Sequence, residues 1–312
     1  MIRVSTIFLR RLLDTFVEKY KYMPYVQVHG VDHYYEWITN SDQSEPTGKP
    51  VMVFVHGWGG SSRYWESTAR AIADSFDCLL YDLRGFGRSN RVPIDLPTRP
   101  DIYELESFAE ELAALLDALG LQRIYLNAHS AGASIAIFFL NLYPERVKKA
   151  ILTCSGIFQY DEKAFTAFHK FGGYVVRYRP RWLYQLPFMD RLFMQRFLHR
   201  PVPQEISRAF LNDFLMADYN TALGTIYTSV SKKASEVMPQ EFSKLTVPTL
   251  LIAGERDIII PAQLGQQAAI LNQKNVQLVI MPETAHFPML EDAPTYLNHI
   301  RGFLGVETAQ SH

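Results

Sequence analysis

A serine, an aspartate and a histidine each stand just beyond the end of an apolar, strand-like run of the sequence. These residues are Ser130, Asp257 and His286, in that chain order. A histidine that is oriented by a carboxylate can take the proton from a serine hydroxyl and so make it a nucleophile. Because the carboxyl ends of parallel strands meet at one edge of a sheet, we expect the three side chains to lie together. The order therefore predicts Ser130 as nucleophile, His286 as general base and Asp257 as the group that orients the histidine.

Ser130 lies where a strand-like pattern changes to a helix-like one, in the stretch LNAHSAGASIAIFFL. Ala128 and Gly132 stand two residues on either side of it, which is the spacing of small residues in a sharp strand-to-helix turn. Such a turn exposes the serine hydroxyl beside the N–H groups of the helix N-terminus. The competing interpretation is a serine that only caps a buried helix. Taken alone, His286 also fits a structural histidine whose hydrogen bonds are satisfied, and Asp257 also fits a residue that caps its loop. The prediction therefore depends on the three residues together.

A glycine-rich loop, HGWGGSS, follows another strand-like run and begins at His56. Gly57 and the two glycines after Trp58 let the backbone bend so that an N–H points into the predicted site. We expect the N–H groups of Trp58 and Ala131 to form an oxyanion hole, and the His56 ring to brace the loop by hydrogen bonding. A phosphate-binding loop is the alternative, but the G-K-[ST] ending of that motif is absent.

The stretch YDLRGFGRSN also follows a strand-like run, and it joins charged residues to glycines. We interpret it as structural rather than catalytic. Asp82 and Arg84 are expected to hold a tight turn through charge-assisted hydrogen bonds. Gly85 and Gly87 are expected to take backbone conformations that other residues avoid.

Strand-like and helix-like runs alternate along most of the chain. The strand-like runs cover residues 34–38, 51–55, 78–81, 124–128, 150–153, 249–253 and 276–280. The clearest helical pattern is SFAEELAALLDALG, in which Ser107 and Glu110 have capping-box spacing and Gly120 ends the helix. A final helix is predicted over residues 293–303. The alternation predicts an α/β fold with a mostly parallel, twisted sheet and helices on both faces.

The alternation breaks between about residues 157 and 244, where helical stretches, prolines and aromatic residues replace strands. We predict a core of residues 26–156 and 245–312, with residues 157–244 inserted as a helical cap, or lid. Ligands of open α/β sheets bind beyond the carboxyl ends of the strands, so this insertion is expected to cover the predicted site. Residues 1–25 are predicted to form an N-terminal amphipathic helix.

Composition and charge exclude some classes of protein. Apolar residues make up 48% and charged residues 20% of the 312 residues, which indicates a globular protein. A formal net charge of −1 gives no overall attraction to nucleic acid, and no nucleic-acid-binding module is present. Cys78 and Cys154 lie inside apolar runs and are expected to be buried thiols rather than a disulfide framework. This usage favours a reducing, cytoplasmic location.

The predicted cap is rich in basic and aromatic residues. Between Lys163 and Arg208 nine basic residues accompany two acidic ones, a local balance of +7. The aromatic residues among them are Phe165, Phe168, Phe171, Tyr174, Tyr178, Trp182, Tyr184, Phe188, Phe193 and Phe197. We expect the aromatic residues to line an apolar substrate tunnel. The charges fit either a solvated outer face or contact with anionic lipid or acidic substrate groups. The N-terminal helix fits either packing on the body of the protein or lying on a membrane surface. Peripheral contact with the inner membrane surface, through this helix or through the basic cap, is therefore an open alternative.

Together these stretches resemble the α/β-hydrolase superfamily, in the branch that carries a cap. The resemblance covers residues 34–304 apart from the cap, and it rests on five motifs in the order of the family. They are HGWGG (56–60), DLRGFGRS (82–89), AHSAG (128–132), GERD (254–257) and HFPMLEDAP (286–294). The resemblance implies a catalytic triad of Ser130, His286 and Asp257, with no metal and no organic cofactor. The supporting residues around the triad are then His56, Gly57, His129 and Gly132.

The resemblance also narrows the reaction. Haloalkane dehalogenases and epoxide hydrolases of this fold carry an aspartate at the position of Ser130, which leaves ester, thioester, amide and some carbon–carbon cleavages. Our first hypothesis is a carboxylesterase- or lipase-like serine hydrolase that forms an acyl-enzyme with a small ester whose acyl or alcohol part is apolar. A carbon–carbon bond hydrolase or thioesterase on the same triad is the second, and a ligand-binding protein without turnover is the third. Alanine replaces the family's usual glycine at Ala128 and Ala133, which is expected to tighten the turn slightly. The oligomeric state stays open.

Overall fold

An eight-stranded sheet forms the centre of the protein in a computed structural model that describes residues 24–41, 45–92 and 101–306. The strands are β1 (Tyr25–Val28), β2 (Val31–Ile38), β3 (Val51–Val55), β4 (Asp77–Tyr81), β5 (Ile124–His129), β6 (Val147–Thr153), β7 (Thr249–Gly254) and β8 (Val276–Met281). Their order in the sheet is β1-β2-β4-β3-β5-β6-β7-β8. β2 pairs antiparallel with β1 and β4, and all other neighbours are parallel. The predicted fold class is confirmed.

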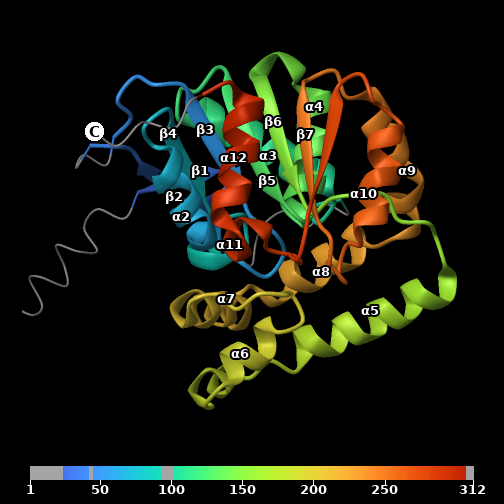
Figure 1. The fold of residues 1–312 in the computed structure, drawn as a ribbon. Helices are drawn as coiled ribbons and strands as arrows, with labels where there is room; N and C mark the ends of the chain where they lie inside the picture. Colours follow the sequence, from blue (N-terminus) through green and yellow to red (C-terminus); the bar gives the residue numbers. More distant parts are fainter. Residues whose placement is uncertain (1–23, 42–44, 93–100, 307–312) are drawn as a thin grey trace, which may run out of the picture.

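Helices cover both faces of the sheet (Figure 1). The longer helices are α2 (Glu66–Ile72), α3 (Leu105–Ala118), α4 (Ala131–Leu142), α5 (Glu162–Arg177), α6 (Met189–Met194), α7 (Gln204–Met216), α8 (Tyr219–Ser229), α9 (Lys232–Lys244), α10 (Ala262–Ile270) and α12 (Ala293–Leu304). Short helical turns are η1 (Ser62–Trp65), η2 (Gly87–Ser89), η3 (Pro144–Arg146), η4 (Arg181–Gln185) and α11 (Pro288–Glu291). Alternate residues of β3 serve the two faces: Val53 packs with α3 and α4, whereas Phe54 packs with α2 and α12.

Three local predictions can be compared with the structure. The final helix is confirmed as α12, and the side chain of Asp292 caps it by accepting a hydrogen bond from the Thr295 N–H (3.3 Å). The capping box is wrong, because α3 already begins at the buried Leu105, which puts Ser107 inside the helix. Strand β1 was missed, since it is a four-residue hairpin arm with two of its residues exposed and only a weak apolar pattern.

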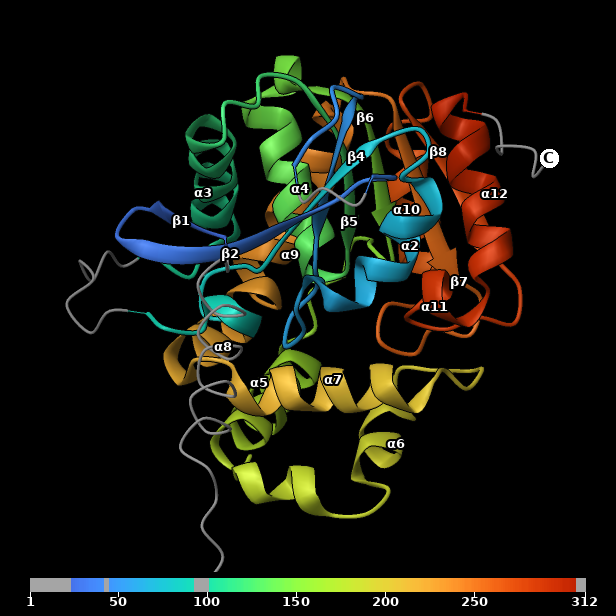
Figure 2. The same cartoon turned by 90° about the vertical axis from the view of Figure 1, so that its left-hand side faces the viewer.

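The connection between β6 and β7, residues 154–248, is called the inserted segment below. It contains α5 to α9 and no strand. Figures 1 and 2 show α5, α6 and α7 beyond one edge of the sheet, whereas α9 lies beside the sheet layers. The contacts of α9 agree with this placement, since Phe242 is buried in the core and the Asn141 amide of α4 donates to the Glu241 carbonyl oxygen (2.9 Å).

Two further findings bear on the sequence predictions. Cys78 and Cys154 are buried free thiols, as expected. No helix in the described ranges is both long and apolar enough to span a bilayer. The helix predicted for residues 1–25 falls outside the described residues, apart from Pro24, which belongs to no helix, and Tyr25, which begins β1.

Candidate active site

Ser130 occupies the turn between β5 and α4, at the carboxyl end of a central strand. Its backbone angles are φ 55° and ψ −124°, a region that residues with a side chain rarely adopt. The Ser130 N–H donates a hydrogen bond to the Thr153 carbonyl oxygen (2.9 Å), which holds the turn against β6. Gly132 lets α4 pass close to β3, because a Cβ there would lie 2.3 Å from the His56 carbonyl oxygen. The small residues around Ser130 thus permit a sharp and strained strand-to-helix turn.

The Ser130 hydroxyl is hydrogen-bonded to a histidine, and the histidine to a carboxylate. Ser130 Oγ lies 3.0 Å from His286 Nε2, and His286 Nδ1 lies 2.7 Å from Asp257 Oδ2. The Ser130 side chain makes no hydrogen bond to the N-terminus of α4, so helix capping does not account for its position. With Asp257 ionised, the proton of the imidazole sits on Nδ1 and Nε2 can accept the serine proton. The structure therefore brings together the three residues that follow β5, β7 and β8.

The main chain of its own loop holds Asp257 in place. Its Oδ1 accepts hydrogen bonds from the N–H groups of Ile259 (2.8 Å) and Ile260 (3.0 Å), and its Oδ2 faces His286. The carboxylate is buried, so these donors and the histidine replace its hydration shell. At the end of β7, a Cβ on Gly254 would lie 2.0 Å from the Ala285 carbonyl oxygen. Glycine at this position is what allows the aspartate and histidine loops to approach each other.

The loop after β3 lies directly against Ser130. A Cβ at Gly57 would be 3.0 Å from the Cβ of Ser130, and Gly59 has a φ of 75°. Ala131 is the first residue of α4, where backbone N–H groups have no partner within the helix. In the described part of the chain, neither the Trp58 N–H nor the Ala131 N–H donates a hydrogen bond. Both N–H groups are thus available to an anion that forms beside Ser130.

A buried hydrogen-bond chain joins the glycine-rich loop, the serine turn and the histidine loop. His129 Nε2 donates to the His286 carbonyl oxygen (2.6 Å), and the Tyr64 hydroxyl donates to His129 Nδ1 (3.0 Å). The Gly57 N–H in turn donates to that hydroxyl (2.5 Å). Burial, and then the nearby His286, lower the pKa of His129 well below its ordinary value, which keeps the ring neutral. Tyr64 is a functional candidate that sequence reasoning missed, and no pattern in the sequence distinguishes it.

His56 braces the glycine-rich loop from the other side. Its Nδ1 donates to the Gly57 carbonyl oxygen (2.8 Å), and its Nε2 accepts a hydrogen bond from the Leu83 N–H (2.9 Å). Burial lowers the pKa of His56, so the ring stays neutral and can accept at one nitrogen while it donates at the other. These are hydrogen bonds of the bracing kind that the sequence predicts for this residue.

Asp82 holds the neighbouring turn, but with a partner other than the one predicted. Arg88 donates to both of its carboxylate oxygens (2.7 and 3.0 Å), and the Ser62 N–H donates to one of them (2.8 Å). Arg84 instead turns toward α3, where it pairs with the buried Glu111 (2.8 Å). Burial alone would raise the pKa of Asp82, but the Arg88 guanidinium outweighs burial and holds that pKa well below its usual range. Two glycines of the turn have positive φ, as predicted.

Glu291 ties the inserted segment to the histidine loop. One carboxylate oxygen accepts hydrogen bonds from the N–H groups of Ala285 (2.9 Å) and Phe287 (3.3 Å), which flank His286. The other oxygen accepts from the N–H groups of His199 (2.7 Å) and Arg200 (2.8 Å) in the inserted segment. The sequence signal for this role is Glu291 itself, which lies five residues after His286 in the HFPMLEDAP motif.

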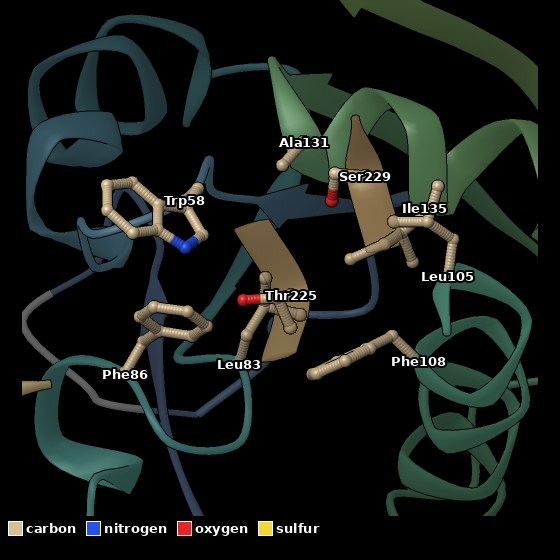
Figure 3. Close-up of a pocket in the computed structure, with 9 residues that line it drawn as sticks. All are labelled: Trp58, Leu83, Phe86, Leu105, Phe108, Ala131, Ile135, Thr225 and Ser229. Atoms are coloured by element: carbon tan, nitrogen blue, oxygen red, sulfur yellow. The ribbon is translucent and has the colours of Figure 1, made fainter. Parts of the chain in front are cut away.

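A small apolar cavity of about 10 Å³ borders the serine turn (Figure 3). Its lining residues are Trp58, Leu83, Phe86, Leu105, Phe108, Ala131, Ile135, Thr225 and Ser229. The volume suits about one water molecule. Thr225 and Ser229 come from α8 of the inserted segment and supply the only hydroxyl groups of this lining. None of the ten aromatic residues expected to line a tunnel borders this cavity, so the apolar lining comes mainly from the core.

Among the described residues, His129, Cys154 and His286 bring metal-ligand types of atom within 4.8 Å of one another. Both nitrogens of His286 already face Ser130 and Asp257. Both nitrogens of His129 are engaged by Tyr64 and by the His286 carbonyl oxygen. The hydrogen bonding of this cluster therefore suits proton transfer at Ser130 rather than coordination of an ion.

Comparison with known proteins gives a family match and distant relatives. The model of the alpha/beta hydrolase fold family matches residues 50–293. An uncharacterized hydrolase, YugF of Bacillus subtilis, is 24% identical over 277 residues, which cover 89% of this chain and 96% of YugF. The putative carbamate hydrolase RutD of Pseudomonas savastanoi is 27% identical over 83% of this chain and 95% of its own length.

A solved structure agrees with the fold along nearly the whole chain. The structure of a putative lipase from Acinetobacter baumannii superposes with a TM-score of 0.73 at 22% identity, and it covers 99% of both chains. At this identity the similarity concerns the fold alone.

Proposed function

Because the chain belongs to the α/β-hydrolase fold family, we propose that it is a serine hydrolase that cleaves carboxylic esters through an acyl-enzyme. The observation that carries the proposal is the continuous chain from Ser130 Oγ through His286 to Asp257. A serine that only capped α4 would direct its hydroxyl to the helix N–H groups, and the Ser130 hydroxyl does not.

The two half-reactions follow from this geometry. Ser130 Oγ attacks the ester carbonyl carbon while His286 Nε2 takes its proton, and Asp257 stabilises the imidazolium. The N–H groups of Trp58 and Ala131 receive the negative charge that develops on the carbonyl oxygen. His286 then gives the proton to the departing alcohol, which leaves an acyl group on Ser130. Water attacks this acyl group with His286 as base, and the acid is released.

The surroundings of Ser130 support an ester with an apolar acyl or alcohol part. The small cavity beside Ala131 is lined almost entirely by carbon side chains, so the first atoms of an apolar group suit this lining better than a charged group does. The inserted segment contributes Thr225 and Ser229 to this lining, and Glu291 fastens another part of it to the histidine loop. In this proposal the inserted segment acts as a cap over the reacting carbonyl.

A panel of p-nitrophenyl esters with acyl chains of two to sixteen carbons tests the function. We expect turnover by the wild-type protein and none above background by Ser130→Ala with an unchanged circular dichroism spectrum. Ser134→Ala, one turn later on α4, is the matched control and should retain activity. Equal turnover by wild type and Ser130→Ala would reject the assignment.

A further inference from the structure

The inserted segment has an exposed surface that combines large apolar side chains with cations. We call it the outer tip, and it consists of Tyr174, Arg177, Tyr178, Arg181, Trp182, Leu186, Phe188, Arg191 and Leu192, all of which are exposed. Trp182 is 57%, Leu192 65% and Phe188 68% exposed. Figures 1 and 2 show this part of the chain, between the end of α5 and α6, on the side of the inserted segment that faces away from the sheet. The outer tip therefore leaves an apolar surface in water at a distance from the core.

Helix α5 extends the outer tip with the same two kinds of side chain. Phe165, Gly172 and Val176 are buried and mark its inner face. At 100° per residue, Lys163, Lys170 and Arg177 fall on the opposite face, seven residues apart. The rings of Tyr174 and Tyr178 lie beside that row and stack on each other at 6.1 Å. The exposed side of α5 thus carries a row of cations beside a pair of stacked aromatic rings.

The charge of this region is of one sign. From residue 163 to residue 204 the only acidic residue is Asp190, and it is buried. The exposed cations of this stretch are Lys163, Lys170, Arg177, Arg181, Arg191 and Arg196. Arg200 has a carboxylate partner, Asp292 (2.9 Å), whereas none of these six forms an ion pair with another described residue. Since the whole chain has a net charge of −1, the positive charge is concentrated on this surface.

Backbone strain accompanies the exposure of one of the apolar side chains. Phe188 has a φ of 62°, a left-handed conformation that a bulky residue rarely adopts. It comes directly before α6. No packing gain offsets this cost, because the ring is mostly in water. A structural role alone would favour glycine or asparagine at this position.

We propose that the outer tip docks the protein on the surface of an anionic lipid bilayer. Tryptophan, tyrosine and phenylalanine insert at the level of the headgroups, and arginine and lysine beside them attract anionic lipid. An acidic protein partner would use the cations but would leave most of the dispersed apolar side chains unburied. Docking through this side places the inserted segment between the bilayer and the sheet edge that carries Ser130.

Sedimentation of the full-length protein with vesicles tests this proposal independently of any enzymatic activity. We expect binding to vesicles of mixed phosphatidylglycerol and phosphatidylcholine, and at least about tenfold weaker partition to phosphatidylcholine alone. The double variants Arg181→Gln/Arg191→Gln and Trp182→Ser/Phe188→Ser should each lower partition to the anionic vesicles by about tenfold or more. The matched controls change exposed residues outside the inserted segment. Ile270→Ser on α10 and Arg70→Gln on α2 should bind the vesicles like wild type.

Circular dichroism melting of each variant establishes that it is folded, so a loss of binding cannot come from unfolding. Wild type that does not sediment with anionic vesicles contradicts the proposal. Sedimentation that is equal in wild type and both double variants also contradicts it, because another part of the chain would then bind the lipid. The third outcome that overturns the proposal is a dimer formed through the outer tip. It would be seen as a dimer of wild type that the double variants disrupt, with no vesicle binding.

Discussion

The serine edge of the sheet and the outer tip differ in how their polar and apolar side chains are exposed and paired. At the serine edge Asp257, His286 and His129 are buried, and each has its hydrogen-bonding atoms engaged by another residue. At the outer tip large apolar side chains and unpaired cations face water. The polar groups of the first region are satisfied by partners within the protein. In our proposal, the exposed side chains of the second region bind a surface outside it. Changes at the serine edge should therefore alter rate or stability, and changes at the outer tip should alter where the protein resides.

Removing the charge of Asp257 gives the largest expected effect. Asp257→Asn keeps the size of the side chain but favours the wrong tautomer of His286, so kcat for a p-nitrophenyl ester should fall by about 10⁴-fold. The melting temperature should change little, because the amide oxygen can still accept from Ile259 and Ile260. A loss of less than about tenfold would show that Asp257 does not orient the histidine.

Asp82 lies close to the site but belongs to its scaffold, so its change should separate stability from rate. Asp82→Asn leaves the guanidinium of Arg88 without its buried partner, and the free energy of unfolding should fall by about 3–5 kcal/mol. Urea denaturation measures the loss. Turnover per folded molecule should stay within a few-fold of wild type, and a stability equal to that of wild type would contradict the role assigned to this turn.

Asp213, in the inserted segment, should make the free energy of unfolding depend on pH. It accepts a hydrogen bond from the Ser61 hydroxyl (2.5 Å) and pairs with Arg63, but burial outweighs both and raises its pKa from 3.8 to about 6. The folded protein then holds the proton more tightly than the unfolded chain. The free energy of unfolding should consequently decrease as the pH rises from about 4 through about 6.

Asp213→Asn should remove this component, which amounts to about 3 kcal/mol for a shift of about two pKa units. Urea denaturation of wild type and variant at pH 4 and pH 7 measures it as the difference between their pH dependences. Parallel pH dependences would show that burial of Asp213 has no such cost.

Glu291 connects the serine edge to the inserted segment at His199 and Arg200, and its change should have a smaller effect on rate. Glu291→Gln replaces one accepting oxygen by an amide that repels the N–H groups facing it, so kcat should fall by about tenfold as the His286 loop loosens. Glu283→Gln is the matched control, since Glu283 lies on the same loop but is exposed and pairs with His199 and Arg256. An equal kcat for the two variants would show that Glu291 does not position His286.

The parallel strands and the serine turn were predictable because their causes are local. Apolar runs of strand length mark β3 and β5, and small residues around Ser130 permit a turn that larger ones would block. Chain order then places Asp257 and His286 at the same edge. The hydrogen bonds of Tyr64 to His129 and of Glu291 to the His199 N–H were not predictable, because no strand end or motif order places these partners together.

The pairing of Arg84 with Glu111 instead of Asp82 has the same cause, since the choice between two nearby arginines depends on which helix packs above the turn. The aromatic residues of the inserted segment were predicted to line a tunnel on composition alone. Composition does not distinguish the inner from the outer face of a helix, and Tyr174, Tyr178, Trp182 and Phe188 are exposed.

Covalent labelling with a fluorophosphonate shows directly whether Ser130 is a nucleophile, because the reagent reacts with a serine only when a base and an oxyanion site activate it. We expect one phosphonyl group per wild-type molecule, located on Ser130 by mass spectrometry, and none on Ser130→Ala. A folded wild-type protein that stays unlabelled would contradict this expectation and would favour a protein that binds a ligand without turnover.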